Sequence, residues 1–461
     1  MDQHDKITFT PIGGGKEIGA NSYLVSVYGH DILLDCGIHP KKEGRASLPD
    51  LALLSRAPIA AVVSHAHVDH CGALPQLIKR YSDVPIFLTE ATRSIMERML
   101  HNSVSVMTAM ARERGIPDYP LYMHEDVDVC MAQTEGFEFD REFDISGDGG
   151  ITVQFHHAGH VLGSASIVLR LPGHNILYTG DICTTDQELM AGSSPYDDYD
   201  DIDTLVIEST YGANEEADDL SYEAQTEQLA SAISQVLNRE GVALLPAFAL
   251  GRTQEILNLI ARLQDSGDIP SVPVYASGLG RAVYEVYSRY SEYLHPAANL
   301  RPLNRFGRIG DVWDRSVAMD LLKEPCIVVA TSGMMVENTP SALIAEQMVR
   351  ANGKRKEHGI FFVGYVDPDT LGYKLLHSGP GTALSFAIGR APVPVSLENV
   401  RHFHFSAHAP RKALRNVIEH VNPRNVVFVH GDSNAVDSLY SETSNAFHKY
   451  APMMGETLTL S

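Results

Sequence analysis

The sequence predicts an α/β protein whose largely parallel sheets are covered by helices. Strand-like and helix-like segments alternate along most of the 461 residues, and four strand-like runs each end at a histidine or a carboxylate. In the middle of the chain we expect a helix over 221–238 before a strand over 242–245, and a helix over 257–263 before a strand over 272–275. The apolar runs 326–330 and 360–365 are typical of buried parallel strands.

Residues 65–70 hold four side chains that commonly bind metals, namely His65, His67, Asp69 and His70. They follow the apolar run 59–64, which we predict to be a buried strand. A strand that ends at such a cluster presents the ligands at a sheet edge, where a divalent ion can bind and keep an open position. Four candidates in six residues therefore predict a metal site rather than isolated structural histidines.

Three further candidates follow strand-like runs elsewhere in the chain. His160 comes after 151–155, Asp181 after 175–177 and His430 after 426–429. Together with the first cluster they make seven, about the number that a two-metal site with one bridging carboxylate needs. We expect these four strand ends to form one rim of one sheet.

The motifs resemble the β-CASP branch of the metallo-β-lactamase fold over nearly the whole chain. The resemblance begins at 12–21 and continues through 34–40 and the histidine cluster. Residues 208–212 resemble motif A of that family, 405–409 motif B and 429–431 motif C, while 245–255 and 331–335 resemble hallmarks of the β-CASP insert. The stretch 34–77 is similar to the endonuclease subunits of eukaryotic pre-mRNA cleavage factors, and the compact length resembles short bacterial and archaeal members.

The resemblance implies a metallo-β-lactamase αββα sandwich interrupted by a β-CASP domain with a parallel sheet flanked by helices. We expect the first part of the sandwich at 1–211, the insert at 212–395 and the returning part at 396–461. The separation of the ligands agrees, because His430 lies 249 positions after Asp181 and must rejoin it.

The same resemblance implies two zinc ions per chain, with manganese as the alternative. His65, His67, His160 and Asp181 would hold one ion, and Asp69, His70, His430 and the bridging Asp181 would hold the other. Asp35 would orient a ligand histidine through its distal N–H. His408 would protonate the leaving oxygen, held protonated by Glu208, and Asp69 would be required for catalysis. Without the family context, Asp35 and Glu208 could equally be strand-end caps.

Contacts to RNA phosphates are expected from three places. The turn at Ser332 and Gly333 would offer backbone N–H groups, and Ser406 would offer its hydroxyl. Arg252 would contact a phosphate or a base, the alternative being a surface arginine at a helix start. Two places depart from the family's pattern. Ala409 and Pro410 stand where members usually carry an acidic residue after the motif B alanine, and 336–340 replace a common Gly-Gly or Ser-Gly pair.

The implied function is hydrolysis of single-stranded RNA by a two-metal hydroxide mechanism in RNA processing or decay, acting either as an endonuclease or as a 5′-to-3′ exonuclease. A DNA nuclease of the same branch is one alternative, but such members typically carry valine where this chain has His430. A small-molecule metallo-hydrolase is another, although it would need neither the insert nor His408. A non-enzymatic scaffold would have lost ligands, and all seven are present.

Composition and charge restrict the partners. The net charge of −22 disfavours broad binding to a nucleic-acid backbone, so we expect one RNA strand in a narrow cleft between the two domains. The acidic runs 197–203 and 215–219 are expected to be solvated loops. Five cysteines without a CxxC pair indicate reduced thiols in the cytoplasm. The N-terminus shows no signal peptide and no apolar run is long enough to span a membrane, so we expect no membrane contact and either a homodimer or a partner complex.

Overall fold

The computed structural model describes residues 6–193, 201–351, 357–379 and 381–460. The chain folds into two compact units. Unit 1 comprises Met1–Thr185, Gly192–Asp219 and His408–Ser461, and unit 2 comprises Asp186–Ala191 and Leu220–Ala407. The long excursion from unit 1 therefore runs from 220 to 407, where the sequence suggested 212 to 395.

Unit 1 contains two mixed seven-stranded sheets, A and B. The order in sheet A is β22 (Leu458–Leu460), β1 (Ile7–Gly13), β2 (Ser22–Val27), β3 (His30–Leu34), β4 (Ala60–Val62), β5 (Ile86–Thr89) and β6 (Thr134–Phe137). The order in sheet B is β21 (His448–Tyr450), β20 (Asn425–Val429), β11 (Thr204–Glu208), β10 (His174–Tyr178), β9 (Ala165–Leu171), β8 (Thr152–His157) and β7 (Glu142–Asp144). Each sheet is parallel in one half and antiparallel in the other.

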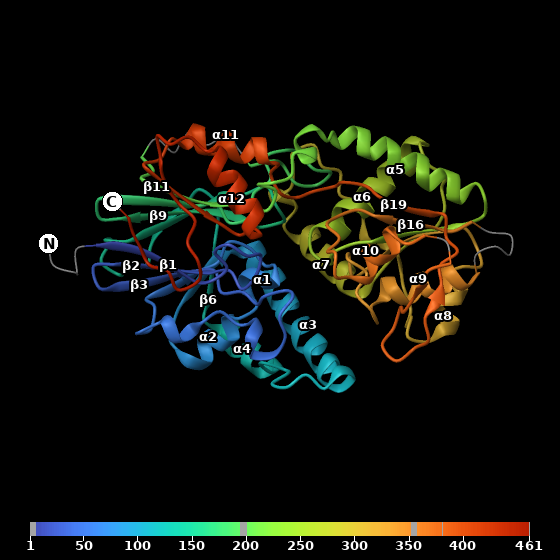
Figure 1. Cartoon of the computed structure of the whole chain (residues 1–461), viewed down its shortest axis with the longest axis horizontal. Helices are drawn as coiled ribbons and strands as arrows, with labels where there is room; N and C mark the ends of the chain where they lie inside the picture. The colour runs from blue at the N-terminus through green and yellow to red at the C-terminus, as the bar shows by residue number, and fades with distance from the viewer. Residues whose placement is uncertain (1–5, 194–200, 352–356, 380, 461) are drawn as a thin grey trace. The chain divides into compact units, whose positions relative to one another are not determined.

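The core of unit 1 lies between the two sheets. Phe9 and Ile32 of sheet A belong to the same buried cluster as Phe155 and Ile167 of sheet B. Helices cover the outer faces: α2 (Leu74–Arg80), α3 (Glu90–Arg114) and α4 (His124–Ala132) lie on the side of sheet A, and α11 (Arg411–Val421) and α12 (Ser433–Glu442) on the side of sheet B (Figure 1). The short helix α1 (Val68–Cys71) follows β4. This is the αββα sandwich that the resemblance implied.

The expectation that the ligand-bearing strand ends share one sheet is wrong. Strand β4, which leads to the histidine cluster, lies in sheet A, whereas β8, β10 and β20 lie in sheet B. A β-branched apolar run indicates that a strand is buried, but it does not say which of two stacked sheets the strand joins. The candidate ligands therefore come from the edges of both sheets.

Unit 2 is built on a parallel six-stranded sheet, as the sequence predicted. Its order is β14 (Gly307–Arg308), β13 (Val274–Ala276), β15 (Cys326–Ala330), β12 (Val242–Pro246), β16 (Gly359–Phe362) and β19 (Asn399–His402). Residues of α5 (Tyr222–Leu237), α6 (Arg252–Ser266) and α7 (Gly278–Arg289) pack on one face, and residues of α8 (Arg315–Asp320), α9 (Pro340–Ala351) and α10 (Leu371–Leu376) on the other. A two-stranded sheet of β17 (Ala383–Leu384) and β18 (Val393–Pro394) completes the unit.

Five 3₁₀ helices lie in the connections of the described chain: η2 (Gly44–Ser47), η3 (Leu51–Leu53), η4 (Glu216–Asp219), η5 (Ser291–Tyr293) and η6 (Leu303–Arg305). Of the acidic run 197–203, residues 197–200 lie outside the described residues. The run 215–219 is not simply a solvated loop, because it forms η4 and pairs with Arg411 through Glu215 and Asp218.

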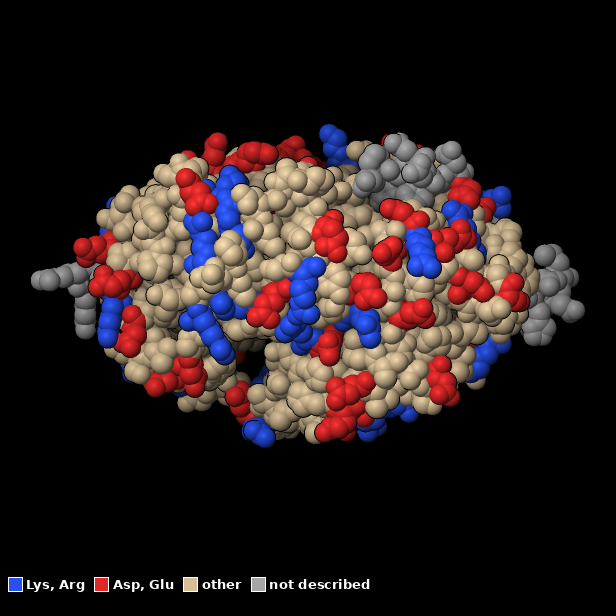
Figure 2. Space-filling model, turned by 180° about the vertical axis from the view of Figure 1, so that it is seen from behind, with Lys and Arg blue, Asp and Glu red and all other residues tan. Residues whose placement is uncertain are grey.

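On the face drawn in Figure 2, acidic and basic side chains are interspersed rather than gathered into one basic stripe. Among the described residues, none of the helices combines the length and the apolar character needed to cross a bilayer.

Candidate active site

Seven side chains of unit 1 converge in two neighbouring groups. Within each group, every residue offers a ligand atom within 4.8 Å of the others. The first group is His65, His67, His160 and Asp181, and the second is Asp69, His70 and His430. The structure thus brings together all seven candidates that the sequence proposed.

In the first group, three imidazole nitrogens face one another. His67 Nδ1 lies 3.0 Å from His65 Nε2 and 3.1 Å from His160 Nε2. Asp181 Oδ2 lies 3.6 Å from His65 Nε2 and 3.7 Å from His160 Nε2. Ring nitrogens that converge in this way present several lone pairs to one point, which is the donor arrangement that zinc takes from imidazoles.

The second oxygen of Asp181 faces the second group. Asp181 Oδ1 lies 3.4 Å from His70 Nε2 and 3.3 Å from His430 Nδ1. Asp69 Oδ2 lies 3.7 Å from His70 Nε2 and 3.5 Å from His430 Nε2. The carboxylate of Asp181 therefore turns one oxygen toward each group, as a ligand shared by two metals does.

The residues fit a divalent metal, because the site leaves a buried anion incompletely compensated. Asp181 Oδ1 is buried and has no hydrogen-bond partner among the described residues. Burial alone would raise the pKa of Asp181, but His430 and His70 hold it well below its usual range, so the carboxylate is ionised. A buried, ionised oxygen without a hydrogen bond is costly, and a bound cation would offset that cost.

The histidines differ in the protonation that the metal-free site favours. Burial lowers the pKa of His65 well below its usual value, so its ring is neutral and keeps a lone pair. Burial also opposes protonation of His70, but Asp181, Asp69 and Asp35 outweigh it and raise the pKa of His70 well above the usual value. A metal bound at His70 must therefore displace a proton.

The local chain path explains how residues 67–70 reach the site. Asp69 and His70 lie in the single turn of α1, whose carbonyl oxygens accept hydrogen bonds from the neighbouring segment: Cys36 N donates to His70 O at 2.8 Å and Ile38 N to Val68 O at 2.9 Å. Between them, a Cβ at Gly37 would lie 1.7 Å from the Asp69 carbonyl oxygen. Only glycine permits the close approach that fixes α1 at this point.

Asp35 lies directly behind both groups and is completely buried. Its Oδ2 accepts hydrogen bonds from His70 Nδ1 at 2.7 Å, from Tyr178 Oη at 2.6 Å and from Ser64 Oγ at 2.7 Å, and its Oδ1 accepts from Ser64 N at 2.7 Å. Ser64 Oγ also lies 3.0 Å from His65 Nδ1, so it can accept a hydrogen bond from that ring while it donates one to Asp35. Asp35 thereby orients one histidine of each group, directly for His70 and through Ser64 for His65.

His408 and Glu208 form a pair beside the first group. Glu208 ends β11, and its two oxygens lie 3.2 and 3.1 Å from His408 Nδ1. The His408 ring lies 4.6 Å from that of His160. Burial would lower the pKa of His408, but Glu208 outweighs it, and with smaller contributions from Asp181 and Asp69 the pKa rises to about 9. The ring is therefore a proton donor at neutral pH, as a general acid must be.

The four candidate RNA contacts, Arg252, Ser332, Gly333 and Ser406, belong to unit 2. Arg252 is the first residue of α6 and is only 7% exposed, so the alternative of a surface arginine is wrong. Its Nη1 is buried and finds no acceptor within the part of the chain that the structure describes. Ser332 and Gly333 follow β15, where Gly333 packs closely against Phe248, and Ser406 is half-buried.

Four polar residues at the site were not assigned a role from the sequence, and one of them is Asn21, whose Nδ2 lies 3.1 Å from His70 Nε2. Ser64 and Tyr178 complete the hydrogen bonds around Asp35, and Thr210 Oγ1 lies 3.1 Å from His430 Nδ1. A buried tyrosine hydroxyl usually finds a polar partner, so Tyr178, three residues before Asp181, offered a signal. For Ser64 and Thr210, the only signal in the sequence was that they lie close to His65 and Glu208.

Comparison with known proteins matches three successive regions of the chain. Residues 15–226 match the metallo-beta-lactamase superfamily, 253–375 the Beta-Casp domain, and 392–450 the Zn-dependent metallo-hydrolase RNA specificity domain. The chain is 32% identical to an RNase J-like protein of Methanocaldococcus jannaschii over 91% of both chains. It is 28% identical to cleavage and polyadenylation specificity factor 73 of Drosophila melanogaster over 95% of this chain and 62% of that protein, so it spans less than two thirds of the fly protein's length.

A solved structure supports the fold. The crystal structure of a protein of unknown function from Enterococcus faecalis superposes with a TM-score of 0.56 and 13% identity, and the match covers 99% of this chain and 100% of that one. The family models and the archaeal relative account for nearly every part of the chain that carries the site. The chain belongs to the β-CASP branch of the metallo-β-lactamase superfamily.

Proposed function

We propose that this protein is a ribonuclease that binds two zinc ions and hydrolyses phosphodiester bonds of single-stranded RNA. The observation that carries the proposal is the placement of Asp181, whose two oxygens face two groups of ligands beside the pair His408–Glu208. The match to an RNA specificity domain and the similarity to an RNase J-like protein support RNA as the substrate class.

The metals and the protein side chains would have different roles in the reaction. When bound, two zinc ions lower the pKa of a water and offset charge on the phosphate oxygens. His408 gives a proton to the departing ribose oxygen. Because its Nδ1 faces Glu208, Nε2 is the nitrogen left to carry that proton. Glu208 holds the ring in this orientation and stabilises its charged form, and Glu208 is itself fixed because its Oε1 accepts a hydrogen bond from Ile182 N at 2.7 Å.

RNA contacts are proposed for unit 2. Arg252 has a buried guanidinium nitrogen without an acceptor among the described residues, and a phosphate oxygen would supply one. Ser332 and Gly333 would add the backbone of a turn, and Ser406 would add a hydroxyl. The net charge of −22 agrees with a few buried contacts better than with a broad basic surface.

The decisive experiment is a competition among matched 5′-labelled single-stranded RNA, duplex RNA and single-stranded DNA at one moderate salt concentration, with zinc or manganese present. We expect preferential cleavage of single-stranded RNA, and the size of the first labelled product separates endonucleolytic from 5′-to-3′ exonucleolytic action. Asp69→Ala protein prepared in the same way controls for contaminating nucleases. Cleavage of the DNA or duplex at an equal or higher rate would contradict the proposal.

Two parallel measurements test the other parts of it. Elemental analysis of the purified protein should find close to two zinc ions per chain, and a single ion despite supplementation would contradict the two-metal site. Rapid hydrolysis of a β-lactam or a thioester, with RNA left intact, would instead identify a small-molecule hydrolase.

A further inference from the structure

The helix that follows His408 lacks an N-terminal cap of its own. Helix α11 begins with Arg411 and Lys412, has no acidic residue in its first turn, and is preceded by Pro410, whose side chain cannot accept a hydrogen bond. The first N–H groups of a helix need acceptors, and cations near its positive end are unfavourable. The local sequence therefore opposes a helix start at the point where His408 has to be held.

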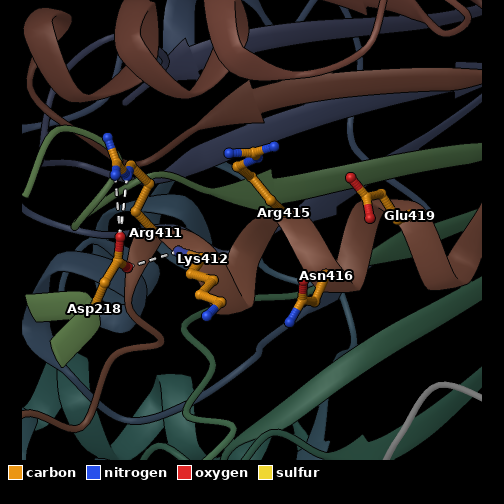
Figure 3. Close-up of a pocket in the computed structure, with 6 residues that line it drawn as sticks. All are labelled: Asp218, Arg411, Lys412, Arg415, Asn416 and Glu419. Carbon is orange, nitrogen blue, oxygen red and sulfur yellow. Dashed lines mark hydrogen bonds and ion pairs between the residues drawn. The ribbon is translucent and has the colours of Figure 1, made fainter. Parts of the chain in front are cut away.

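Asp218 supplies the missing acceptor from η4, almost 200 positions upstream. Its Oδ1 accepts a hydrogen bond from Lys412 N at 2.8 Å, and its Oδ2 lies 3.3 and 3.2 Å from Nε and Nη2 of Arg411 (Figure 3). One carboxylate thus caps the backbone of one residue and binds the side chain of the residue before it. The acidic group also offsets the charge at the helix start.

Arg411 also forms ion pairs with two other residues of unit 1. Its Nη1 donates to Glu442 Oε1 of α12 at 2.9 Å and to Glu215 Oε1 at 3.1 Å. Only 13% of the Asp218 side chain and 16% of the Arg411 side chain are exposed. Partial burial with several partners makes this more than an ordinary surface ion pair.

The capped turn lies next to the proposed general acid. Between His408 and α11 stands the fully buried Ala409, whose N–H donates to Ile182 O at 2.6 Å. Ile182 N in turn donates to Glu208, the partner of His408. The backbone of His408 is thus set on one side by the Ile182 contact and on the other by the first turn of α11.

We propose that Asp218 and Arg411 are positioning residues, which fix the first turn of α11 so that His408 keeps its contact with Glu208. The inference rests on the function proposed for His408, and it assigns to η4 a role that the run of acidic residues 215–219 did not suggest. Neither residue needs to touch RNA.

The test uses the zinc-loaded protein of residues 1–461 and three variants of it. In Asp218→Ala, we expect faster amide exchange at the start of α11 and a fall in kcat of up to about tenfold, because the free energy of one helix cap limits how much positioning of His408 its loss can remove. KM and zinc content should change little. Adding Pro410→Asp to Asp218→Ala restores a cap at the adjacent position, because an N-cap aspartate can accept from Lys412 N or Ala413 N. It should therefore recover both exchange protection and kcat. Asp219→Ala, at the exposed neighbouring carboxylate, is the matched control and should behave as wild type.

Two outcomes overturn the inference. Wild-type kcat in Asp218→Ala would show that the cap does not position His408, and so would a double variant that regains exchange protection but not kcat. If Asp218→Ala fails to fold, Asp218→Asn serves instead: it keeps an acceptor for Lys412 N but loses the charge opposite Arg411, so kcat should fall by a smaller factor, and wild-type kcat in this variant would overturn the inference. If wild type does not cleave RNA, the proposed function fails, but the NMR signals of the His408 ring still decide the inference: they should shift in Asp218→Ala and return in the double variant, and unchanged signals would refute it.

Discussion

Replacing Asp35 with asparagine should weaken metal binding through a change in which nitrogen of the His70 ring carries a proton. The introduced amide could keep the bond from Ser64 N at its oxygen, but its NH₂ group would replace the oxygen that now accepts from His70, Tyr178 and Ser64 Oγ. The two hydroxyls can rotate to accept. The His70 ring can accept at Nδ1 only if that nitrogen gives up its proton, and Nε2, the nitrogen that faces Asp181 and Asp69, then carries the one proton that remains. A protonated Nε2 has no lone pair for a metal.

The magnitude follows from the number of hydrogen bonds changed. Loss of an orienting partner typically lowers metal affinity by about 10–100-fold. Three hydrogen bonds to a buried charge are altered, each worth about 1.5–3 kcal/mol, and rotation of the two hydroxyls recovers part of that energy. We expect the metal-free variant to lose about 2–4 kcal/mol of unfolding free energy.

The assay is zinc content after equilibration against a series of buffered free-zinc concentrations, together with urea unfolding of the metal-free protein. The matched control is Asp31→Asn, which changes a buried carboxylate of β3 that is bound by Arg56 and Ser26. It should be destabilised while its zinc affinity stays unchanged. Zinc affinity equal to wild type in Asp35→Asn would refute the tautomer argument, whatever happened to stability.

Three other predictions concern the site. His408→Ala should keep both metals but slow cleavage by about 10²–10⁴-fold, whereas Asp69→Ala should lose metal as well as activity. If His408→Ala cleaves at the wild-type rate across pH 6–9, His408 is not the general acid. Because Glu208 raises the pKa of His408, Glu208→Gln should move the alkaline fall in kcat to lower pH. An alkaline limb of the pH profile that stays at the same pH would show that Glu208 does not control the proton on His408. Because the pKa of His70 is raised, its charged form stabilises the metal-free protein at low pH, and this contribution is lost as pH rises through that pKa. Zinc affinity should rise over the same pH interval, because zinc binding releases the His70 proton. A zinc affinity that does not depend on pH would contradict this prediction.

The parts of the site that could be predicted from the sequence are those in which the signal is local. His65 to His70 stand together in the chain, and Asp181 and His430 each follow an apolar strand, so their chemistry was visible without the fold. The assignment of β4 to a different sheet from β8, β10 and β20 was not visible, because the alternation of buried residues is the same on either side of a sandwich. The burial of Arg252 was also missed, since a helix-start arginine is usually solvated.

Long-range polar partners were the least predictable features. Asp218 caps a helix almost 200 residues away, and nothing in the run 215–219 distinguishes it from its exposed neighbours. The absence of a cap at Pro410 was visible in the sequence, but the residue that compensates for it was not. A missing local acceptor therefore signals that a distant partner exists without identifying it.

The distribution of the site residues between the two units helps to distinguish a ribonuclease from a small-molecule hydrolase. All seven candidate ligands, Asp35 and the pair Glu208–His408 belong to unit 1, and the excursion into unit 2 begins directly after η4 and ends just before His408. Both edges of the insertion therefore adjoin residues proposed to hold the general acid, Asp218 on one side and His408 itself on the other. A small-molecule hydrolase would require neither this acid nor its cap. The elaboration around His408 is therefore best explained by a substrate whose leaving group needs a proton, as the ribose oxygen of an RNA phosphodiester does.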